Sequence, residues 1–416
     1  MDGYSAGALR PGPLALVAVL AAVIGGAVAL AAGGALDWVG PGRTETVMAV
    51  SPTLPPADQE TTPSQSTARP LEGTSFDPAR IYAARADGVV TIFAYFTRGG
   101  SDAAGTGGQG SGFVVSQDGY VLTNSHVVTT AGTVSAANVS AADEVFVEFR
   151  NGDRVSARVV GWDLFDDVAL LKVGARTEGL RPVPLGDSSG VVVGEPVAAI
   201  GSPFGAENSL ATGVVSATGR TIPALTSSYS LVDAIQIDAP INRGNSGGPL
   251  FDARGRVIGI NAQIRSNSGL AEGVGFAVPI NSARRSMDEL IAHRKVAYAY
   301  VGVRTDDMWP ALARRLKLAV GRGAEIVDVT SGGPAADAGL RGASRTISFQ
   351  GQSVRVGGDV VVAVDGRRVS DADELVQIVT NNLRPGATAV FSVLRGGKRL
   401  DVPVAVGERP ALPSSG

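Results

Sequence analysis

Short apolar runs separated by polar turns fill most of the chain from Phe76 onward. Segments such as GSGFVVSQDGYVLTNSHVV and EVFVEFRNGDRVSARVV alternate apolar and polar positions, and turns of the QDGY and RNGD type interrupt them. An alternation of period two broken by such turns predicts antiparallel hairpins. Many short strands at this spacing indicate an all-β barrel or sandwich for the first half of the ordered chain.

Two segments around this β region have helical character instead. Asp77 followed by Pro78 places an N-cap and a proline at the first helical position, so a short helix should precede the first strand. The segment PINSARRSMDELIAHRKVA predicts a second helix, which Asn281 or Ser282 would cap. This second helix would close the first domain and lead into the next one.

A different pattern begins after the second helix. Residues 298–407 alternate short Val-rich strands with short helices, and a hairpin near the end turns on Gly396–Gly397. We therefore expect a second, smaller domain here, followed by a flexible tail at 408–416. The loop 343–356 is a local elaboration of this domain to which the sequence assigns no role.

The N-terminal residues have no charged side chain between Arg10 and Asp37. After a short tail at 1–13, residues 14–36 are almost wholly Leu, Val, Ala, Ile and Gly, long enough to cross a hydrocarbon core of ~30 Å. We expect an uncleaved transmembrane helix with the remaining domains outside the cytoplasm. A cleaved signal peptide and a buried core helix are the alternatives, and the flanking charges indicate orientation only weakly.

Residues 37–75 are rich in Pro, Thr, Ser, Gln and Glu. Such a composition cannot bury enough apolar surface to fold, so we expect a disordered linker.

Composition excludes several kinds of site. The 416 residues include no cysteine and two histidines, His126 and His293. The absence of cysteine excludes thiol nucleophiles and disulfides, and two histidines are too few for a multi-histidine zinc site. A net charge of −3 gives no overall field that would favour nucleic acid.

The segment INRGNSGGPL, residues 241–250, is a candidate for the loop that carries a nucleophilic serine. A nucleophilic serine needs its hydroxyl on a tight loop with backbone N–H groups aimed at the developing oxyanion, and glycines permit that turn. Ser246 lies in such a frame, so the loop Gly244, Asn245 and Ser246 would form the oxyanion hole, with the N–H groups of Gly244 and Ser246 as donors. Taken alone, the motif could also be a Gly/Ser surface turn.

Two further residues complete a triad. His126 follows the strand-like VLTNS, and Asp167 directly precedes the buried run VALLKV, with Asp163 and Asp166 as nearby rivals. The order His126, Asp167, Ser246 is that of chymotrypsin and differs from subtilisin and the α/β-hydrolases. It predicts acyl transfer through Ser246 with His126 as base and Asp167 orienting it, and this needs no metal or organic cofactor.

The segments TNSHVV, DDVALLKV, GSPFG and INRGNSGGPL together resemble the catalytic segments of the HtrA/DegP family of serine proteases. YVGV, GPAADAGLRGA and GGDVVVAVDGRRV are similar to a PDZ domain. The resemblance implies a mostly β fold, with a chymotrypsin-like double β-barrel at 76–297 and one PDZ domain at 298–407. Ser125 stands where Asn is frequent and Val301 where Leu is, and we expect neither to touch the triad.

The resemblance also implies a function and partners. A membrane-anchored endopeptidase of this type would cleave unfolded or damaged extracytoplasmic proteins and associate as a homotrimer through the segment that begins at Phe76. The PDZ domain would bind free C-termini through a carboxylate-binding loop of four residues: Tyr300, Val301, Gly302 and Val303. Leu375, Ile378 and Val379 would line the pocket for the last side chain. A catalytically quiet chaperone or PDZ scaffold at the membrane is the alternative.

Substrate preference rests on the residue six positions before Ser246. In chymotrypsin-like folds that residue lies at the base of the primary specificity pocket. Here it is Pro240, followed by Ile241, and the opposite wall would come from Asn261 and Ala262 in GINAQI. Without an acid to bind Lys or Arg, the pocket should prefer Val, Ala, Leu or Ile. In the alternative, the register differs and these residues are core.

Overall fold

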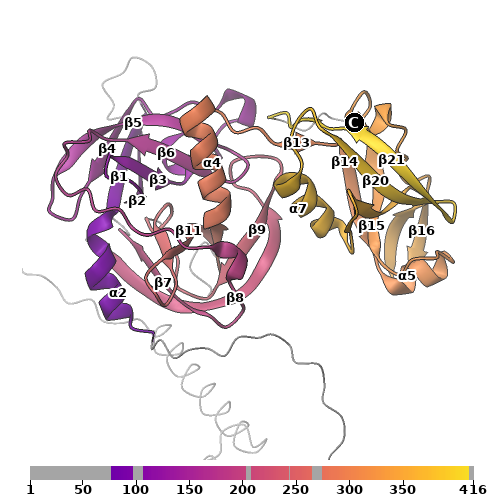
Figure 1. Ribbon diagram of the computed structural model, residues 1–416, viewed down its shortest axis with the longest axis horizontal. Helices are drawn as coiled ribbons and strands as arrows, with labels where there is room; N and C mark the ends of the chain where they lie inside the picture. Colours follow the sequence, from indigo (N-terminus) through magenta and orange to yellow (C-terminus); the bar gives the residue numbers. More distant parts are fainter. Residues whose placement is uncertain (1–75, 97–105, 203–207, 243, 265–273, 412–416) are drawn as a thin grey trace, which may run out of the picture. The chain divides into compact units, whose positions relative to one another are not determined.

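A computed structural model describes residues 76–96, 106–202, 208–242, 244–264 and 274–411, and the structural statements below concern these residues (Figure 1). The transmembrane helix predicted at 14–36 and the linker predicted at 37–75 lie outside them. Within the described part, none of the helices has both the length and the apolar character needed to span a bilayer.

The first barrel is closed by six antiparallel strands in the order β1-β2-β3-β6-β5-β4. Its strands are β1 (Val89–Phe96), β2 (Thr106–Val114), β3 (Tyr120–Thr123), β4 (Glu144–Glu148), β5 (Arg154–Asp163) and β6 (Val168–Lys172). The QDGY and RNGD turns join β2 to β3 and β4 to β5, which confirms the two predicted hairpins.

The second barrel is closed in the order β10-β11-β12-β9-β8-β7. Its strands are β7 (Pro196–Gly201), β8 (Ser209–Pro223), β9 (Ser230–Ile237), β10 (Pro249–Phe251), β11 (Val257–Ile264) and β12 (Gly275–Pro279). The mostly β double barrel expected from the sequence is confirmed (Figure 1).

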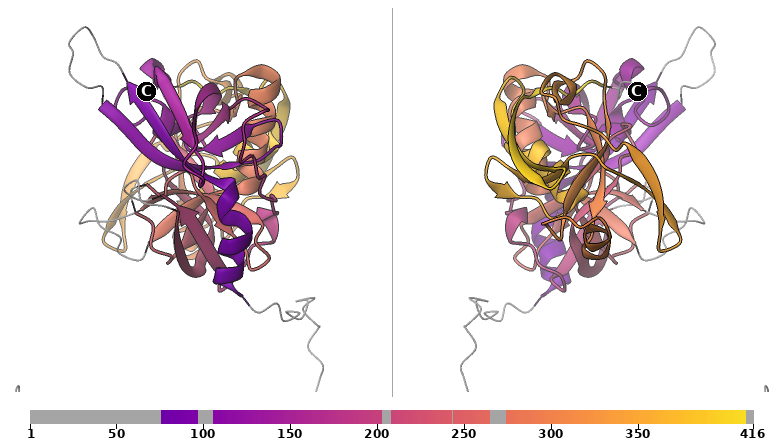
Figure 2. Two further views of the ribbon diagram at one scale, coloured as in Figure 1. Left: turned by 90° about the vertical axis from the view of Figure 1, so that its left-hand side faces the viewer. Right: turned by 90° about the vertical axis from the view of Figure 1, so that its right-hand side faces the viewer.

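Helices flank the barrels at the two ends of this region (Figures 1 and 2). Helix α2 (Pro78–Arg85) packs against β7 and β8, and the Asp77 side chain caps it by accepting a hydrogen bond from the Arg80 N–H, as predicted. The short helices are α3 (Ser125–Val128), η1 (Ala86–Gly88), η2 (Ala136–Asn138) and η3 (Ser188–Gly190).

Helix α4 (Ile280–His293) crosses from one barrel to the other, because it contacts β5 and β6 of the first and β11 and β12 of the second. The predicted cap at Asn281 or Ser282 is wrong: Pro279 is the N-cap residue, and both polar residues lie inside the helix. The Asn281 amide instead donates to Asp187 Oδ1 at 2.7 Å. That carboxylate lies far away in sequence, so local pattern did not indicate it.

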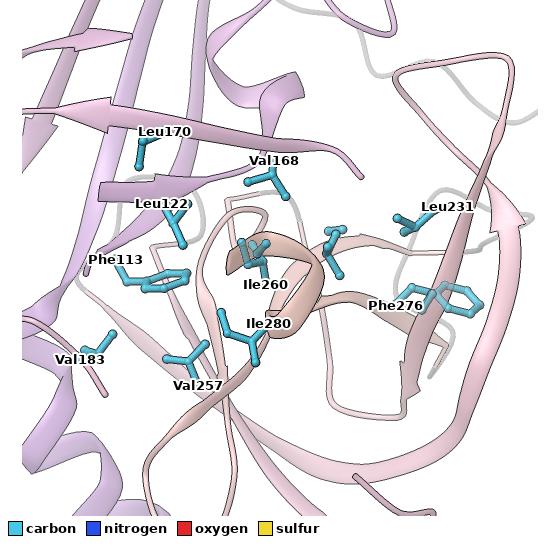
Figure 3. Close-up of a cluster of buried hydrophobic side chains, with 14 of the residues drawn as sticks. Phe113, Leu122, Val168, Leu170, Val183, Leu231, Val257, Ile260, Phe276 and Ile280 are labelled. Carbon is cyan, nitrogen blue, oxygen red and sulfur yellow. The ribbon is translucent and has the colours of Figure 1, made fainter. Parts of the chain in front are cut away.

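One hydrophobic cluster joins the two barrels beneath α4 (Figure 3). Phe113 and Leu122 contribute from the first barrel, Ile260 and Phe276 from the second, and Ile280 from the helix. Because the cluster is shared, the catalytic segments carried by the two barrels are fixed relative to each other. Val296 and Tyr298, which follow α4, also belong to this cluster.

The C-terminal unit starts a new cluster at Ala299 and Val301. Its main sheet has the order β14-β15-β18-β20-β21, which makes β14 an edge strand. The strands of the unit are β13 (Ala299–Tyr300), β14 (Val303–Met308), β15 (Gly323–Val329), β16 (Arg345–Phe349), β17 (Gln352–Val356), β18 (Val360–Val364), β19 (Arg367–Arg368), β20 (Thr388–Arg395), β21 (Lys398–Ala405) and β22 (Gly407–Glu408). Its helices are α5 (Pro310–Arg315), α6 (Pro334–Asp337) and α7 (Ala372–Asn382).

The loop 343–356 forms the β16–β17 hairpin. Val354 and Val356 of this hairpin pack with Leu312 of α5 in a small cluster of their own. The elaboration therefore extends the core of the C-terminal unit over α5.

Candidate active site

His126 and Asp167 are brought together by the ends of two paired strands. Helix α3 starts directly after β3, and Asp167 directly precedes β6, which pairs with β3. The His126 Nδ1 lies 2.7 Å from Asp167 Oδ2, and the His126 backbone N–H donates to Asp167 Oδ1 at 3.1 Å. These two contacts fix the orientation of the imidazole and leave its Nε2 for a substrate-side partner.

Asp167 has an unusual backbone conformation, with φ of 52°. Left-handed backbone costs a residue other than glycine roughly 1–2 kcal/mol, so the surroundings must hold it. The Asn124 side chain donates to the Asp167 carbonyl at 2.7 Å, and the Ser125 N–H donates to the same oxygen at 3.3 Å. The segment before the histidine therefore holds the backbone of Asp167 in place.

Ser125 contacts the candidate triad, contrary to the expectation from its sequence position. Its buried hydroxyl donates to Asp167 Oδ1 at 2.7 Å. The start of α3 turns this side chain back toward the carboxylate that the next residue also binds. Val301, the other departure, is buried in the C-terminal unit.

The pKa of His126 is raised from its ordinary value. Burial of the imidazole would lower that pKa, but the negative charge of Asp167 and its hydrogen bond to Nδ1 favour the protonated ring and outweigh burial. A raised pKa is suited to a base that holds a proton during acyl transfer.

We predict that Ser125→Ala lowers kcat by about tenfold, because a buried hydrogen bond to a charged group contributes roughly 1.5–3 kcal/mol. Loss of this donor should leave Asp167 less firmly placed while KM stays unchanged. Steady-state kinetics on a short peptide would check the split between kcat and KM. Ser125→Thr, which keeps a hydroxyl, is the matched control, and equal losses in both variants would contradict this role.

Ser246 lies on the loop that enters β10, between the two barrels. Its hydroxyl donates to the Ala262 carbonyl at 3.1 Å. Among the hydrogen bonds of the described residues there is none from Ser246 to His126. The loop nevertheless adjoins the histidine segment, because a Cβ added to Gly247 would lie 3.1 Å from the Asn124 nitrogen.

Ser111 on β2, which no sequence motif singled out, anchors the serine loop. Its N–H donates to the Ser246 carbonyl at 2.8 Å, and its hydroxyl donates to the Gly244 carbonyl at 2.5 Å. Thr123 on β3 donates in turn to the Ser111 carbonyl at 2.7 Å. The GSG sequence at 110–112 could have pointed to Ser111, because glycines on both sides of a residue in a strand indicate that another backbone approaches closely.

The backbone N–H groups of the loop are partly committed. The Asn245 N–H donates to the Asn242 carbonyl at 3.0 Å, and the Gly247 N–H donates to the Asn261 carbonyl at 2.8 Å. Gly244 and Ser246 therefore remain as the candidate donors to an oxyanion, with Asn245 between them. Arg243 lies outside the described residues.

The four residues predicted for the specificity pocket occupy different environments. Pro240 is exposed, whereas Ile241 is buried in the second barrel's hydrophobic cluster. Asn261 is fully buried and its amide donates to the Pro249 carbonyl at 3.2 Å. Ala262 is buried and presents its carbonyl to Ser246. A role for these residues in substrate preference remains a prediction.

The two rival acids lie apart from the imidazole. Asp163 accepts hydrogen bonds from Ser286 and Tyr298, and Asp166 pairs with Arg285 at 2.8 Å. Burial, and next the charge of Asp166, raise the pKa of Asp163 to about 6. The structure thus brings only Asp167 of the three to His126.

The predicted carboxylate-binding loop is tightly held in the C-terminal unit. The Val301 carbonyl accepts from the Ala335 N–H at 2.8 Å, and the Gly302 carbonyl accepts from the Thr330 N–H at 2.9 Å. Gly302 has φ of 78°, which suits glycine. Tyr300 and Val303 lie in β13 and β14 on either side of this turn.

Helix α7, which was predicted to line a pocket, combines buried and half-buried positions. Leu375 and Ile378 of α7 are buried in the core of the unit, and Val379 is partly buried against it. Helix α7 contacts the edge strand β14. The loop, the edge strand and helix α7 thus belong to one unit, and peptide binding by them remains a prediction.

Comparison with known proteins supports both halves of this description. Residues 110–260 match the family described as trypsin-like peptidase domain, and residues 299–406 match the PDZ domain family. A protein from Pseudomonas fulva (strain 12-X) named probable periplasmic serine endoprotease DegP-like is 40% identical over 302 residues, 73% of this chain and 56% of its own. A protein of the same name from Hahella chejuensis (strain KCTC 2396) is 40% identical over 317 residues, 76% of this chain and 60% of its own. The chain thus spans somewhat over half the length of these curated relatives.

Solved structures give a more complete match. The HtrA-type protease AlgW with tripeptide superimposes with a TM-score of 0.66 and 34% identity, covering 80% of this chain and 98% of that one. A serine endoprotease from Yersinia pestis gives a TM-score of 0.56 and 28% identity, with 80% of this chain and 98% of that chain covered. The similarity therefore extends across both domains.

Proposed function

Since this chain belongs to the HtrA/DegP family of trypsin-like serine proteases with a C-terminal PDZ domain, we propose that it is a serine endopeptidase whose nucleophile is Ser246. The observation that carries the proposal is the 2.7 Å contact between His126 Nδ1 and Asp167 Oδ2 beside the glycine-framed serine loop. The loss of any of these three side chains should abolish most of the activity.

The reaction starts with rotation of the Ser246 hydroxyl away from the Ala262 carbonyl and toward His126 Nε2. His126 takes the hydroxyl proton as the oxygen attacks the scissile carbonyl, and Asp167 stabilises the resulting imidazolium. The N–H groups of Gly244 and Ser246 would stabilise the oxyanion. The protonated His126 then donates to the leaving amine, and water hydrolyses the acyl-enzyme.

A fluorophosphonate probe that labels activated serines tests this assignment without a known substrate. The full-length protein should be labelled at Ser246, found by mass spectrometry of the labelled peptide. His126→Ala should lose the labelling, whereas His293→Ala, at an exposed position of α4, should keep it. Labelling at another serine, or equal labelling in the His126 variant, would contradict the mechanism.

We propose unfolded or damaged extracytoplasmic proteins as the substrates. The relatives named above are described as periplasmic, and the apolar segment at 14–36 would hold the protease domain on the outer side of the membrane as a retained anchor. Carbonate extraction of membranes tests the anchor: release of the full-length protein without detergent would contradict it. The predicted preference for Val, Ala, Leu or Ile before the scissile bond, which rests on Pro240 and Ile241, would be tested by identifying the cleavage products of casein.

We also propose a homotrimer formed through the segment after the linker, where Phe76, Ile81 and Tyr82 are gathered. Ile81 is buried against the protease's own core, whereas Phe76 and Tyr82 are only partly buried, so the exposed parts of these two side chains would be available to a partner. Sedimentation of the detergent-solubilised protein would decide between three copies and one.

For the PDZ domain we propose recognition of free C-termini. Because β14 is an edge strand beside α7, a peptide can add to the sheet while its carboxylate reaches the loop around Gly302. We predict that a peptide with an apolar C-terminal residue binds at least tenfold more tightly as the free acid than as the amide, since the amide lacks the charge that the loop N–H groups bind. Fluorescence anisotropy would measure both, and equal affinities would contradict this mode.

A further inference from the structure

A buried carboxylate that the catalytic cycle does not use lies four residues before Asp167. Asp163 ends β5, and only 2% of its surface is exposed. Burying an ionised carboxylate is unfavourable unless it is fully hydrogen-bonded. The arrangement of its partners therefore indicates what it does.

One oxygen of Asp163 closes the turn that leads to the catalytic acid. Its Oδ1 accepts from the Phe165 N–H at 2.9 Å and from the Asp166 N–H at 3.3 Å. An aspartate that binds backbone groups two and three residues ahead stabilises a tight turn. The next residue is Asp167 with its left-handed backbone, so this turn determines where the catalytic carboxylate starts.

The other oxygen ties the same turn to the body of the protease domain. Its Oδ2 accepts from the Ser286 hydroxyl of α4 at 2.7 Å and from the Tyr298 hydroxyl at 2.5 Å. Ser286 and Tyr298 are both buried, and Tyr298 packs with the cluster that joins the barrels. Asp163 therefore accepts four hydrogen bonds, which is the full capacity of a carboxylate.

The charges around this site are paired without using His126. Arg285 of α4 donates to Asp166 Oδ2 at 2.8 Å and to the Tyr298 hydroxyl at 3.1 Å. The guanidinium of Arg409 lies 5.1 Å from the centre of the Tyr298 ring. Asp166, Tyr298, Arg285 and Arg409 are the titratable or charged groups that interact electrostatically with Asp163. An apolar cluster of similar volume would be less costly for stability alone.

We infer that Asp163, held by Ser286 and Tyr298, is a positioning residue for Asp167: it fixes the 163–166 turn so that the catalytic carboxylate points at His126 Nδ1. This inference rests on the proposed function, since it assigns a role in the same triad. It predicts that loosening the turn moves Asp167 away from the imidazole without altering the substrate-binding surface.

Three substitutions in the full-length protein test the inference. Asp163→Ala removes all four hydrogen bonds and should lower kcat by about 100-fold with KM changed less than threefold, as expected for a small misplacement of a catalytic group. Asp163→Asn keeps the acceptor for the two turn N–H groups and can donate to the Ser286 and Tyr298 oxygens, so it should retain kcat within about tenfold. Tyr298→Phe removes one hydroxyl and should have an intermediate effect.

The pKa of His126 provides a readout that does not depend on proteolysis. The chain has two histidines, so selective ¹³C labelling gives two imidazole signals, and His293→Gln assigns them. Because Asp167 is what raises the pKa of His126, that pKa should fall in Asp163→Ala and in Tyr298→Phe, and stay near its original value in Asp163→Asn. If the wild type cleaves nothing, the proposed function fails while this titration still decides the positioning role.

The matched control is Ser392→Ala in the PDZ domain, which removes a hydroxyl that donates to the Asp401 carboxylate at 2.6 Å, far from the triad in sequence and fold. It should leave the pKa of His126 and kcat unchanged. If Asp163→Ala does not fold, Tyr298→Phe decides the question. An unchanged histidine pKa together with unchanged kcat in the folded Asp163 or Tyr298 variants would overturn the inference, as would the same shift in Ser392→Ala.

Discussion

Replacing Ser246 with alanine should lower kcat for casein or peptide hydrolysis by roughly four to six orders of magnitude. The reason is that the hydroxyl is the only proposed nucleophile, and its removal leaves the oxyanion donors and the substrate contacts without a covalent route. His126→Ala should cause a loss of similar size, because the hydroxyl then has no base. The measurement is single-turnover cleavage at saturating substrate with the purified full-length protein.

Both variants should keep the native fold, so a loss of activity would report the loss of a catalytic group and not unfolding. Within the described part of the chain, the Ser246 hydroxyl makes one hydrogen bond, to the Ala262 carbonyl, and the His126 side chain is 22% exposed. The double variant Ser246→Ala, His126→Ala should be no slower than either single variant, because residues that act as a unit do not contribute additively. Proteolysis that persists in the Ser246 variant would contradict the assignment of the activity to the triad.

Gly247→Ala is expected to have the largest effect on stability. Gly247 has φ of 85°, and an added Cβ would lie 2.2 Å from the Ser111 carbonyl oxygen and 2.3 Å from Thr123 Oγ1. Backbone strain of roughly 1–2 kcal/mol and overpacking of roughly 1–3 kcal/mol should combine, because the serine loop and β2 cannot both keep their places. Thermal unfolding should show a melting temperature lower by about 10 °C, and activity should be lost with it.

Gly152→Ala is the matched control for the backbone contribution. Gly152 lies in the β4–β5 turn with φ of 83°, and a Cβ there would meet nothing within 4 Å. Its variant should lose only about 1 kcal/mol and remain active. If the two alanine variants unfolded at the same temperature, the close approach of the serine loop to Ser111 would not be what requires glycine at position 247.

The features that could be predicted from the sequence are those determined by near neighbours. Asp77 and Pro78 mark the start of α2, and the QDGY and RNGD turns mark two hairpins, because each depends on backbone preferences within four residues. The order of His126, Asp167 and Ser246 carries the candidate triad for a similar reason. It needs only that each residue follow or precede a recognisable strand.

The features that were missed depend on partners distant in the chain. Asn281 is engaged by Asp187 and therefore does not cap α4. Ser125 reaches Asp167, and the Ser246 hydroxyl reaches Ala262. No local pattern records such contacts, since they arise only when the barrels close. The sequence accordingly predicts which residues form the site better than it predicts how they are held.

The packing of Tyr298 bears on how such proteins can be recombined. Val296 and Tyr298 pack in the core of the double barrel, whereas Ala299 belongs to the core of the PDZ domain. The boundary between the two domains therefore falls between Tyr298 and Ala299. A gene fusion that joins this protease to a foreign PDZ domain upstream of Tyr298 would exchange a side chain that holds Asp163 as well as the ligand-binding module. Shuffling of these modules, in evolution or in the laboratory, should therefore preserve activity only where the crossover falls after the tyrosine or where the incoming module supplies an equivalent hydroxyl.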